Sequence, residues 1–147
     1  MGAGKTRLGQ ALAHRLGYHF IDLDSEIAAV AGLSITEIFA QEGEIAFRLR
    51  EQETLHAISL SALAQETSCI IACGGGTACY HENLEFMKAQ GFVIFLDVPP
   101  ETLCERLLQQ TPQRPLLPYS RKEDLLPHIQ KLLKTRLPFY TQAHWSC

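Results

Sequence analysis

The first six residues, MGAGKT, are of the types that bind the phosphates of a nucleotide. Gly4, Lys5 and Thr6 supply the last three fixed positions of the phosphate-binding pattern G-x-x-x-x-G-K-[ST], whose first glycine would precede Met1. Backbone N–H groups from Gly2 to Lys5 can cradle phosphate oxygens, assisted by the dipole of the following helix. The Lys5 ammonium suits the outer phosphates, and the Thr6 hydroxyl suits Mg²⁺. A glycine-rich start without a function is the alternative.

An acidic pair, Asp22 and Asp24, lies in the strand-like run at 18–24. We expect both side chains on one face of that strand, because residues two apart in a strand point to the same side. At the carboxyl end of a parallel strand, two carboxylates can serve Mg²⁺ and a substrate hydroxyl. The alternative is that Asp24 caps the helix expected to begin at Ser25.

Three consecutive glycines, Gly74 to Gly76, follow an apolar strand expected at 68–73. A glycine run carries a large conformational-entropy cost, and close approach of the backbone to a ligand is the usual reason for one. A tight turn is the alternative. The pattern therefore favours a second ligand-binding loop.

Three arginines, Arg48, Arg114 and Arg136, can bind carboxylate or phosphate through the planar guanidinium. By itself, Arg48 is typical of a solvated charge on a helix face. Arg136 stands at a helix end, where the helix dipole alone would favour a cation. Arg114 lies in a proline-flanked loop and suits a mobile lid over the transferred phosphate.

Apolar spacing, caps and glycines place these residues on alternating helices and strands. The long helix at 44–64 is expected to direct five side chains toward the core: Ile45, Leu49, Leu55, Ile58 and Ala62. The other predicted helices are 6–16, 25–31, 34–41 (begun by a Ser34–Glu37 capping box), 83–90, 100–109 and 126–136, the last stopping before Pro138. With strands at 18–24, 68–73 and 92–97 and a loop at 111–119, the pattern predicts a doubly wound α/β sheet.

Composition narrows the class of protein. The 147 residues suit one domain, and the net charge of -3 comes without a basic stretch that would bind nucleic acid. No apolar run approaches the roughly 20 residues that span a bilayer, and the N-terminus does not resemble a signal peptide. The five cysteines have neither C-x-x-C nor zinc-ligand spacing, so we expect free thiols in a reducing, cytoplasmic setting.

The chain resembles the shikimate kinases over nearly its whole length. The matching stretches are MGAGKT, FIDLD, SITEIFAQEGEIAFR, IIACGGG, FLDVPPETLCERL, RPLL and RLPFY. The resemblance implies a single domain over 1–147 with the three-layer P-loop fold of nucleoside-monophosphate kinases, a parallel sheet ordered 2-3-1-4-5 and flanking helices. It also implies transfer of the ATP γ-phosphoryl to the 3-hydroxyl of shikimate, a step toward chorismate and the aromatic amino acids, by a monomer.

The resemblance also assigns roles to individual residues. It places ATP on the loop Gly2, Ala3, Gly4, Lys5, Thr6 and Arg7, and on Arg114 in a lid at about 111–122. It assigns Mg²⁺ to Thr6 and Asp22, and shikimate to Asp24, Arg48, Gly75, Gly76 and Arg136. The catalytic set is Lys5, Asp24 as the general base, and Arg114.

The chain departs from the family pattern in two local places and at both ends. Many members have an arginine that stacks on adenine where this chain has the uncharged run 109–113, and Arg7 replaces the usual Ser or Thr. The leading strand and the last strand and helix of the family fold are expected to be missing. Losing about five buried apolar side chains, at about 1.5–3 kcal/mol each, would approach the whole stability of a domain, about 5–15 kcal/mol. We therefore expect the chain to fold poorly alone, with a misassigned start.

Two other functions stay open from the sequence. A different small-molecule P-loop kinase, such as a gluconate kinase, would share the phosphate loop and the Mg²⁺ ligand. It would not require Asp24, Arg48 and Arg136 to meet at a hydroxylated ring acid. The other alternative is a degenerate remnant that binds nucleotide weakly or not at all.

Overall fold

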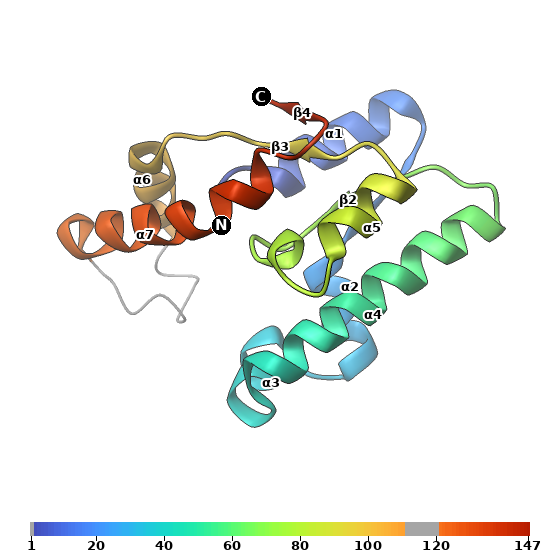
Figure 1. The fold of residues 1–147 in the computed structure, drawn as a ribbon, viewed down its shortest axis with the longest axis horizontal. Coiled ribbons are helices and arrows are strands. Elements are labelled where there is room, and N and C mark those ends of the chain that lie inside the picture. Colours follow the sequence, from blue (N-terminus) through green and yellow to red (C-terminus); the bar gives the residue numbers. More distant parts are fainter. Residues whose placement is uncertain (1, 111–120) are drawn as a thin grey trace. The chain divides into compact units, whose positions relative to one another are not determined.

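The computed structural model describes residues 2–110 and 121–147, which belong to two compact units (Figure 1). One unit comprises residues 4–86, and the other comprises residues 1–3 and 87–147. The proposed lid at 111–122 falls almost entirely outside the described residues. Lys122, at the end of that range, is the first residue of a helix.

The unit at 4–86 is built around one pair of parallel strands. Its elements are α1 (Lys5–Leu16), β1 (His19–Asp22), α2 (Leu23–Ala31), α3 (Ile35–Gln41), α4 (Gly43–Ala64), β2 (Cys69–Ala72) and the 3₁₀ helix η1 (Thr77–Cys79). Strands β1 and β2 pair from His19 opposite Cys69 to Asp22 opposite Ala72. Both strands therefore end at the same edge of the sheet, where α2 and the glycine run begin.

Helix α1 packs tightly on strand β1 because Gly9 has no side chain. A Cβ on Gly9 would lie 2.6 Å from the ring of Phe20. The helix ends as the sequence predicts, at Gly17 in the left-handed conformation (φ 68°), whose N–H bonds to the Ala13 carbonyl. The capping box of Ser34 and Glu37 at the start of α3 is confirmed as well.

Helix α4 buries a different face from the one that its apolar spacing predicts. Leu55 is buried as expected, but Ile45 is 86% exposed and Leu49 is 49% exposed. The buried face carries Phe47, Arg48, Glu51 and Leu55. Helix α4 packs against α2, α3 and η1. Predicting the buried face from the spacing of apolar residues alone misses it, because two of the buried residues, Arg48 and Glu51, are a charged pair.

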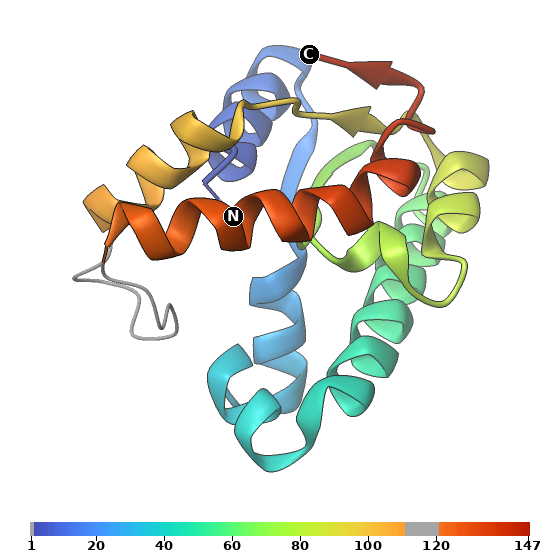
Figure 2. The same ribbon diagram turned by 60° about the vertical axis from the view of Figure 1, so that its left-hand side comes forward.

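The other unit consists of the end of α5 (Asn83–Gln90), β3 (Ile94–Phe95), α6 (Pro100–Gln110), α7 (Lys122–Tyr140) and β4 (Trp145–Ser146). Helices α6 and α7 lie side by side (Figure 2) and share a core of Leu103, Cys104, Leu107, Leu125 and Ile129. Strands β3 and β4 are parallel, with Ile94 opposite Trp145.

Three predictions for this unit need correction. The strand expected at 92–97 is only the two residues of β3, and the last strand, expected to be missing, is present as the two-residue β4. Helix α7 starts at Lys122 and continues through Pro138 to Tyr140. Beyond Pro138, the Thr141 N–H donates to the Leu137 carbonyl at 3.0 Å.

The α/β class with parallel strands and flanking helices is confirmed. The described strands form two separate parallel pairs, β1–β2 and β3–β4. Within residues 2–110 and 121–147, every helix is too short or too polar to cross a bilayer.

Candidate active site

The phosphate loop leads directly into helix α1. Gly4 is the residue before the helix and has φ 89°, a left-handed conformation that favours glycine, and Lys5 is the first helical residue. The first turn of α1 contains no acidic residue, so no carboxylate within that turn offsets the positive end of the helix dipole. Arg7 is exposed on the same turn. This arrangement suits an anion at the helix N-terminus.

Gly2 and Ala3 belong to the other compact unit. The Gly2 carbonyl accepts a hydrogen bond from Arg106 Nη1 at 3.2 Å. A Cβ on Gly2 would lie 3.3 Å from a side-chain carbon of Leu107, and the residue has φ 74°. A larger residue at position 2 would therefore be strained by its backbone and crowded by α6.

Thr6 and Asp22 meet as the sequence predicts, but the acidic pair does not share a strand. The Thr6 hydroxyl donates to Asp22 Oδ2 at 3.2 Å. Strand β1 ends at Asp22, whose Oδ1 accepts from the Ser25 N–H at 3.3 Å and so caps α2. Asp24 thus lies in the first turn of α2, and the prediction that both carboxylates project from one strand face is wrong. The capping residue is Asp22, not Asp24.

Asp24 stands in a negative environment. Its carboxylate remains open to solvent on one side, while the surrounding chain desolvates the other. This desolvation, followed by the charges of Asp22 and Glu51, raises the pKa of Asp24, and Lys5 opposes the rise. A carboxylate with a raised pKa is a better proton acceptor than an ordinary aspartate.

Gly74 lies where three side chains from separate elements approach the end of β2. A Cβ on Gly74 would be 2.9 Å from Glu51 Oε1, 3.1 Å from Thr77 Oγ1 and 3.3 Å from Asp24 Oδ1. The Thr77 hydroxyl donates to Glu51 Oε1 at 2.6 Å, and both residues are fully buried. Any larger residue at position 74 would press on this group, which explains the first glycine of the run.

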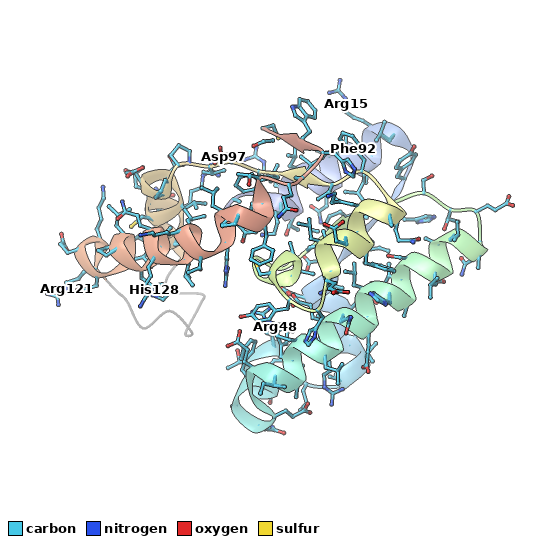
Figure 3. All side chains as sticks on the ribbon, viewed as in Figure 1. Arg15, Arg48, Phe92, Asp97, Arg121 and His128 are labelled. Carbon is cyan, nitrogen blue, oxygen red and sulfur yellow. The ribbon has the colours of Figure 1, made fainter. Side chains whose placement is uncertain are left out.

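Arg48 is buried on the inner face of α4, so the expectation of a solvated charge is wrong (Figure 3). Its Nη1 donates to Glu51 Oε2 at 2.7 Å, and its Nε and Nη2 donate to Glu44 Oε1 at 3.3 and 3.2 Å. Burial disfavours the charged guanidinium, but the hydrogen bonds and charges of Glu51 and Glu44 outweigh it and raise the pKa of Arg48. The guanidinium is therefore fixed as a cation.

The glycine run makes room for this guanidinium. A Cβ on Gly76 would lie 2.6 Å from Arg48 Nη2 and 2.7 Å from Nη1. Gly75 is half-buried between the two crowded glycines. Because Gly76 has an ordinary backbone conformation (φ -103°), the close approach of Arg48 is what requires a glycine there.

Sequence reasoning missed the residues that orient Arg48. Glu51 lies one turn after Arg48 and Glu44 one turn before it, and Tyr80 and Thr77 follow the glycine run. The two glutamates could have been found from their spacing, because residues three or four positions from an arginine on a helix can pair with it. Nothing in the sequence pointed to Thr77 or Tyr80.

The other predicted site residues lie outside the unit at 4–86 or outside the described residues. Arg136 is half-buried on α7, in the other compact unit, so its pairing with Arg48 stays a prediction. Arg114 lies outside the described residues. The roles assigned to the site residues therefore stay predictions, and the structure describes the local surroundings of those from Gly4 to Gly76.

Cys73, next to the glycine run, does not provide a nucleophile. Burial, aided by the charges of Glu51 and Asp24, raises the pKa of the Cys73 thiol to about 12. The thiol therefore stays protonated near neutral pH, and only the thiolate is reactive. The five cysteines, all among the described residues, form no disulfides with one another.

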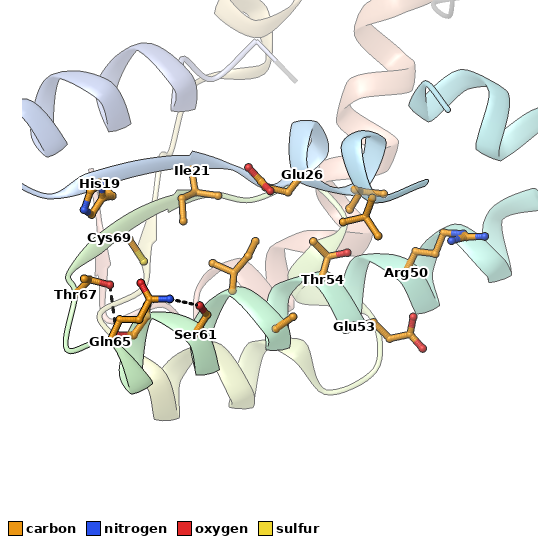
Figure 4. Close-up of a pocket in the computed structure, with 15 residues that line it drawn as sticks. His19, Ile21, Glu26, Arg50, Glu53, Thr54, Ser61, Gln65, Thr67 and Cys69 are labelled. Atoms are coloured by element: carbon orange, nitrogen blue, oxygen red, sulfur yellow. Dashed lines mark hydrogen bonds between the residues drawn. The ribbon is translucent and has the colours of Figure 1, made fainter. Parts of the chain in front are cut away.

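A hollow of about 600 Å³ lies between α2, α4 and the strands β1 and β2 (Figure 4). Its lining mixes apolar side chains such as Ile21 and Ile58 with Arg50 and Glu53. None of the predicted site residues lines it. The candidate active site is the cluster at the strand ends, not this hollow.

Comparisons with known proteins agree on one family. A family model described as shikimate kinase matches residues 1–147. The shikimate kinase of Bacteroides thetaiotaomicron is 40% identical over 145 residues, which cover 99% of this chain and 80% of that protein. The chain spans about four-fifths of that relative.

Solved structures give the same answer. A crystal structure of the shikimate kinase from Bacteroides thetaiotaomicron superposes with a TM-score of 0.91 at 39% identity, covering 99% of this chain and 80% of that chain. The shikimate kinase from Acinetobacter baumannii, solved in complex with shikimate, has a TM-score of 0.84 at 38% identity, covering 100% and 78%. With a phosphate loop, an acidic cluster and a fixed arginine at the strand ends, the chain belongs to the shikimate kinase family.

Proposed function

We propose that this chain transfers the γ-phosphoryl group of ATP to the 3-hydroxyl of shikimate. Family membership and the shikimate-bound relative support the reaction. The observation that carries the proposal for this chain is the fixed Arg48 guanidinium, held by Glu51 and Glu44 against Gly76. The carboxylate of Asp24 flanks the same glycine run.

Arg48 is suited to bind the substrate carboxylate. A guanidinium has five N–H donors, and the described hydrogen bonds use three of them, one each on Nε, Nη1 and Nη2. One donor therefore remains on each terminal nitrogen. Two parallel donors match the two oxygens of a carboxylate. Arg136 is the second proposed partner of that carboxylate, and the Gly75 and Gly76 backbone is proposed to contact the ring.

Asp24 is the proposed general base. As the 3-hydroxyl oxygen attacks the γ-phosphorus, the hydroxyl proton passes to the Asp24 carboxylate and the bond from phosphorus to the ADP oxygen breaks. The raised pKa of Asp24 brings its basicity closer to neutral pH. Lys5 lies near enough to lower that pKa in part, which fits a cation between the carboxylate and the phosphates.

Thr6 and Asp22 fit the Mg²⁺ that accompanies ATP. Both present oxygen atoms, and Mg²⁺ usually takes one or two protein oxygens beside water and phosphate. The described residues contain no group of three or more His, Cys, Asp or Glu side chains arranged as a metal cage, which agrees with that mode. The ion would neutralise phosphate charge, while Lys5, the Gly4 loop and Arg114 would orient the phosphates.

The test is ADP release by this chain with Mg-ATP and either shikimate or gluconate as the acceptor. We expect release with shikimate and background release with gluconate. Release with gluconate alone would favour a different small-molecule kinase, and none with either acceptor would favour an inactive remnant. Product identity is checked by ³¹P NMR of the phosphorylated acid, because ATP hydrolysis would also release ADP.

A further inference from the structure

Tyr80 contacts Arg48 from outside the set of predicted site residues. It follows η1 and reaches back to α4, where its ring centroid lies 4.4 Å from Arg48 Cζ. Its hydroxyl donates to Glu44 Oε1 at 3.2 Å. One side chain thus touches both the cation and the carboxylate that holds it.

The Glu44 contact needs this support. The Glu44 side chain is 54% exposed, whereas the other partner of Arg48, Glu51, is fully buried and also held by Thr77. Glu44 Oε1 receives Arg48 Nε, Arg48 Nη2 and the Tyr80 hydroxyl. An exposed glutamate is otherwise free to rotate into solvent, so the tyrosine hydroxyl limits its rotamers toward Arg48.

The ring acts on the cation itself. A guanidinium within about 6 Å of a tyrosine ring is attracted by the negative charge of the ring face. Glu44 and Glu51 determine which N–H groups of Arg48 are used, and the ring limits the tilt of the guanidinium plane. Together they leave one N–H on each terminal nitrogen for an acceptor molecule.

We propose that Tyr80 is a positioning residue that holds Arg48 and Glu44 in the geometry that binds a carboxylate-bearing acceptor. This inference rests on the proposed function, because the acceptor carboxylate is assigned there to Arg48. Tyr80 acts on acceptor binding, through Arg48, and not on phosphoryl transfer or on ATP.

The test compares Tyr80→Phe and Tyr80→Leu with the wild type. Phe keeps the ring and loses the hydroxyl, and Leu loses both. We expect KM for shikimate to rise about 3-fold in Y80F and about 10-fold or more in Y80L. The value of kcat and KM for ATP should stay within about 2-fold, since neither contact involves the phosphates. Partial rescue by Phe distinguishes positioning by the ring from a general loss of structure.

Tyr18 is the matched control. It is 42% exposed against 38% for Tyr80 and precedes β1, outside the proposed site. Y18F and Y18L should leave both KM values unchanged. A wild-type KM for shikimate in Y80L, or an equal rise in KM for ATP, would overturn the inference.

A second readout separates this inference from the proposed function. The ¹⁵N–¹H signal of Arg48 Nε, assigned by its absence in R48K, reports the guanidinium directly. We expect Y80F and Y80L to shift or broaden that signal, and an unchanged signal would refute the positioning role. If the wild type shows no shikimate-dependent turnover, the proposed function fails, and the Arg48 signal still decides whether Tyr80 orients the cation.

Discussion

Two faces of helix α4 carry an arginine paired with glutamate, and they differ in burial. On the face that lines the hollow, called the outer face here because Arg50 is the more exposed of the two arginines, Arg50 binds both oxygens of Glu42 at 2.8 and 2.9 Å, and its side chain is 39% exposed. On the inner face, Arg48 binds Glu44 at longer distances and Glu51 at 2.7 Å, with its side chain 9% exposed. The better two-oxygen geometry therefore belongs to the outer pair.

The two arginines thus differ in burial, and the better pairing geometry belongs to the one outside the proposed site. An exposed ion pair contributes about 0–1 kcal/mol because water and salt screen it. A buried pair costs desolvation, and removing one partner leaves an uncompensated buried charge. Arg48 is 9% exposed and keeps two N–H donors that its glutamates do not use, whereas the side chain of Arg50 is 39% exposed. The predictions that follow test this contrast between the inner and outer faces.

The largest effect is expected on the chemical step, at the carboxylate near the inner face. Asp24→Asn removes the proposed base and should lower kcat about 10²- to 10⁴-fold. Glu53→Gln is the control on the outer face, because Glu53 is exposed beside Arg50. It should leave kcat within about 2-fold. Steady-state ADP release with saturating shikimate measures both, and equal kcat values for D24N and wild type would remove Asp24 from catalysis.

The next effect tests the two arginines themselves. Arg48→Met should lower kcat/KM for shikimate at least about 30-fold, because truncating a buried hydrogen-bonded charge costs about 2 kcal/mol or more. Arg50→Met should change it less than about 2-fold. Thermal unfolding of both variants controls for loss of the fold. Similar losses of kcat/KM in folded R48M and R50M would contradict the claim that only the buried arginine binds the acceptor.

A smaller effect is expected in stability from the glutamate partners. Glu51→Gln should reduce the free energy of unfolding by about 1.5–3 kcal/mol, because it weakens buried hydrogen bonds with Arg48 and Thr77. Glu42→Gln should reduce it by about 1 kcal/mol or less, since its pair is exposed. Urea unfolding gives both values. Raising the salt concentration should reduce the Glu42 effect and leave most of the Glu51 effect.

The sequence predicted the parts of this site that local pattern determines. The resemblance to the shikimate kinases assigned Thr6 and Asp22 to one Mg²⁺ site, and the two side chains are hydrogen-bonded in the structure. Gly17 and the Ser34 capping box could be read from residue type, since both satisfy backbone groups within a few positions.

The parts that failed depend on contacts distant in sequence. Whether Arg48 is buried depends on Glu51, on Gly76 and on a loop about thirty residues away, and its apolar neighbours Ile45 and Leu49 pointed to the wrong face. Asp24 was misplaced because a single hydrogen bond, from the Ser25 N–H to Asp22, ends the strand two residues early. The positions of Arg114 and Arg136 in the site remain predictions.

The smallest effect concerns the dependence of stability on pH, where Asp24 and Glu37 should show opposite signs. The pKa of Asp24 is raised in the folded chain, so folding takes up a proton between the ordinary aspartate pKa, about 3.9, and the raised value. Above that range the ionised Asp24 lowers stability, through desolvation and the charges of Asp22 and Glu51. Asp24→Asn should therefore raise Tm at neutral pH, and the gain should vanish below about pH 3.9, where Asp24 is protonated.

Glu37 is the control of opposite sign. Its hydrogen bonds from the Ser34 side chain and backbone, at 2.6 and 2.8 Å, lower the pKa of Glu37. The ionised Glu37 therefore stabilises the folded chain above the ordinary glutamate pKa, and this contribution is lost as pH falls through the lowered value. Glu37→Gln should lower Tm at neutral pH and make less difference in acid. If D24N lowered Tm at neutral pH as E37Q does, the carboxylate of Asp24 would be stabilised by its surroundings, and the argument for a basicity raised by the inner face would fail.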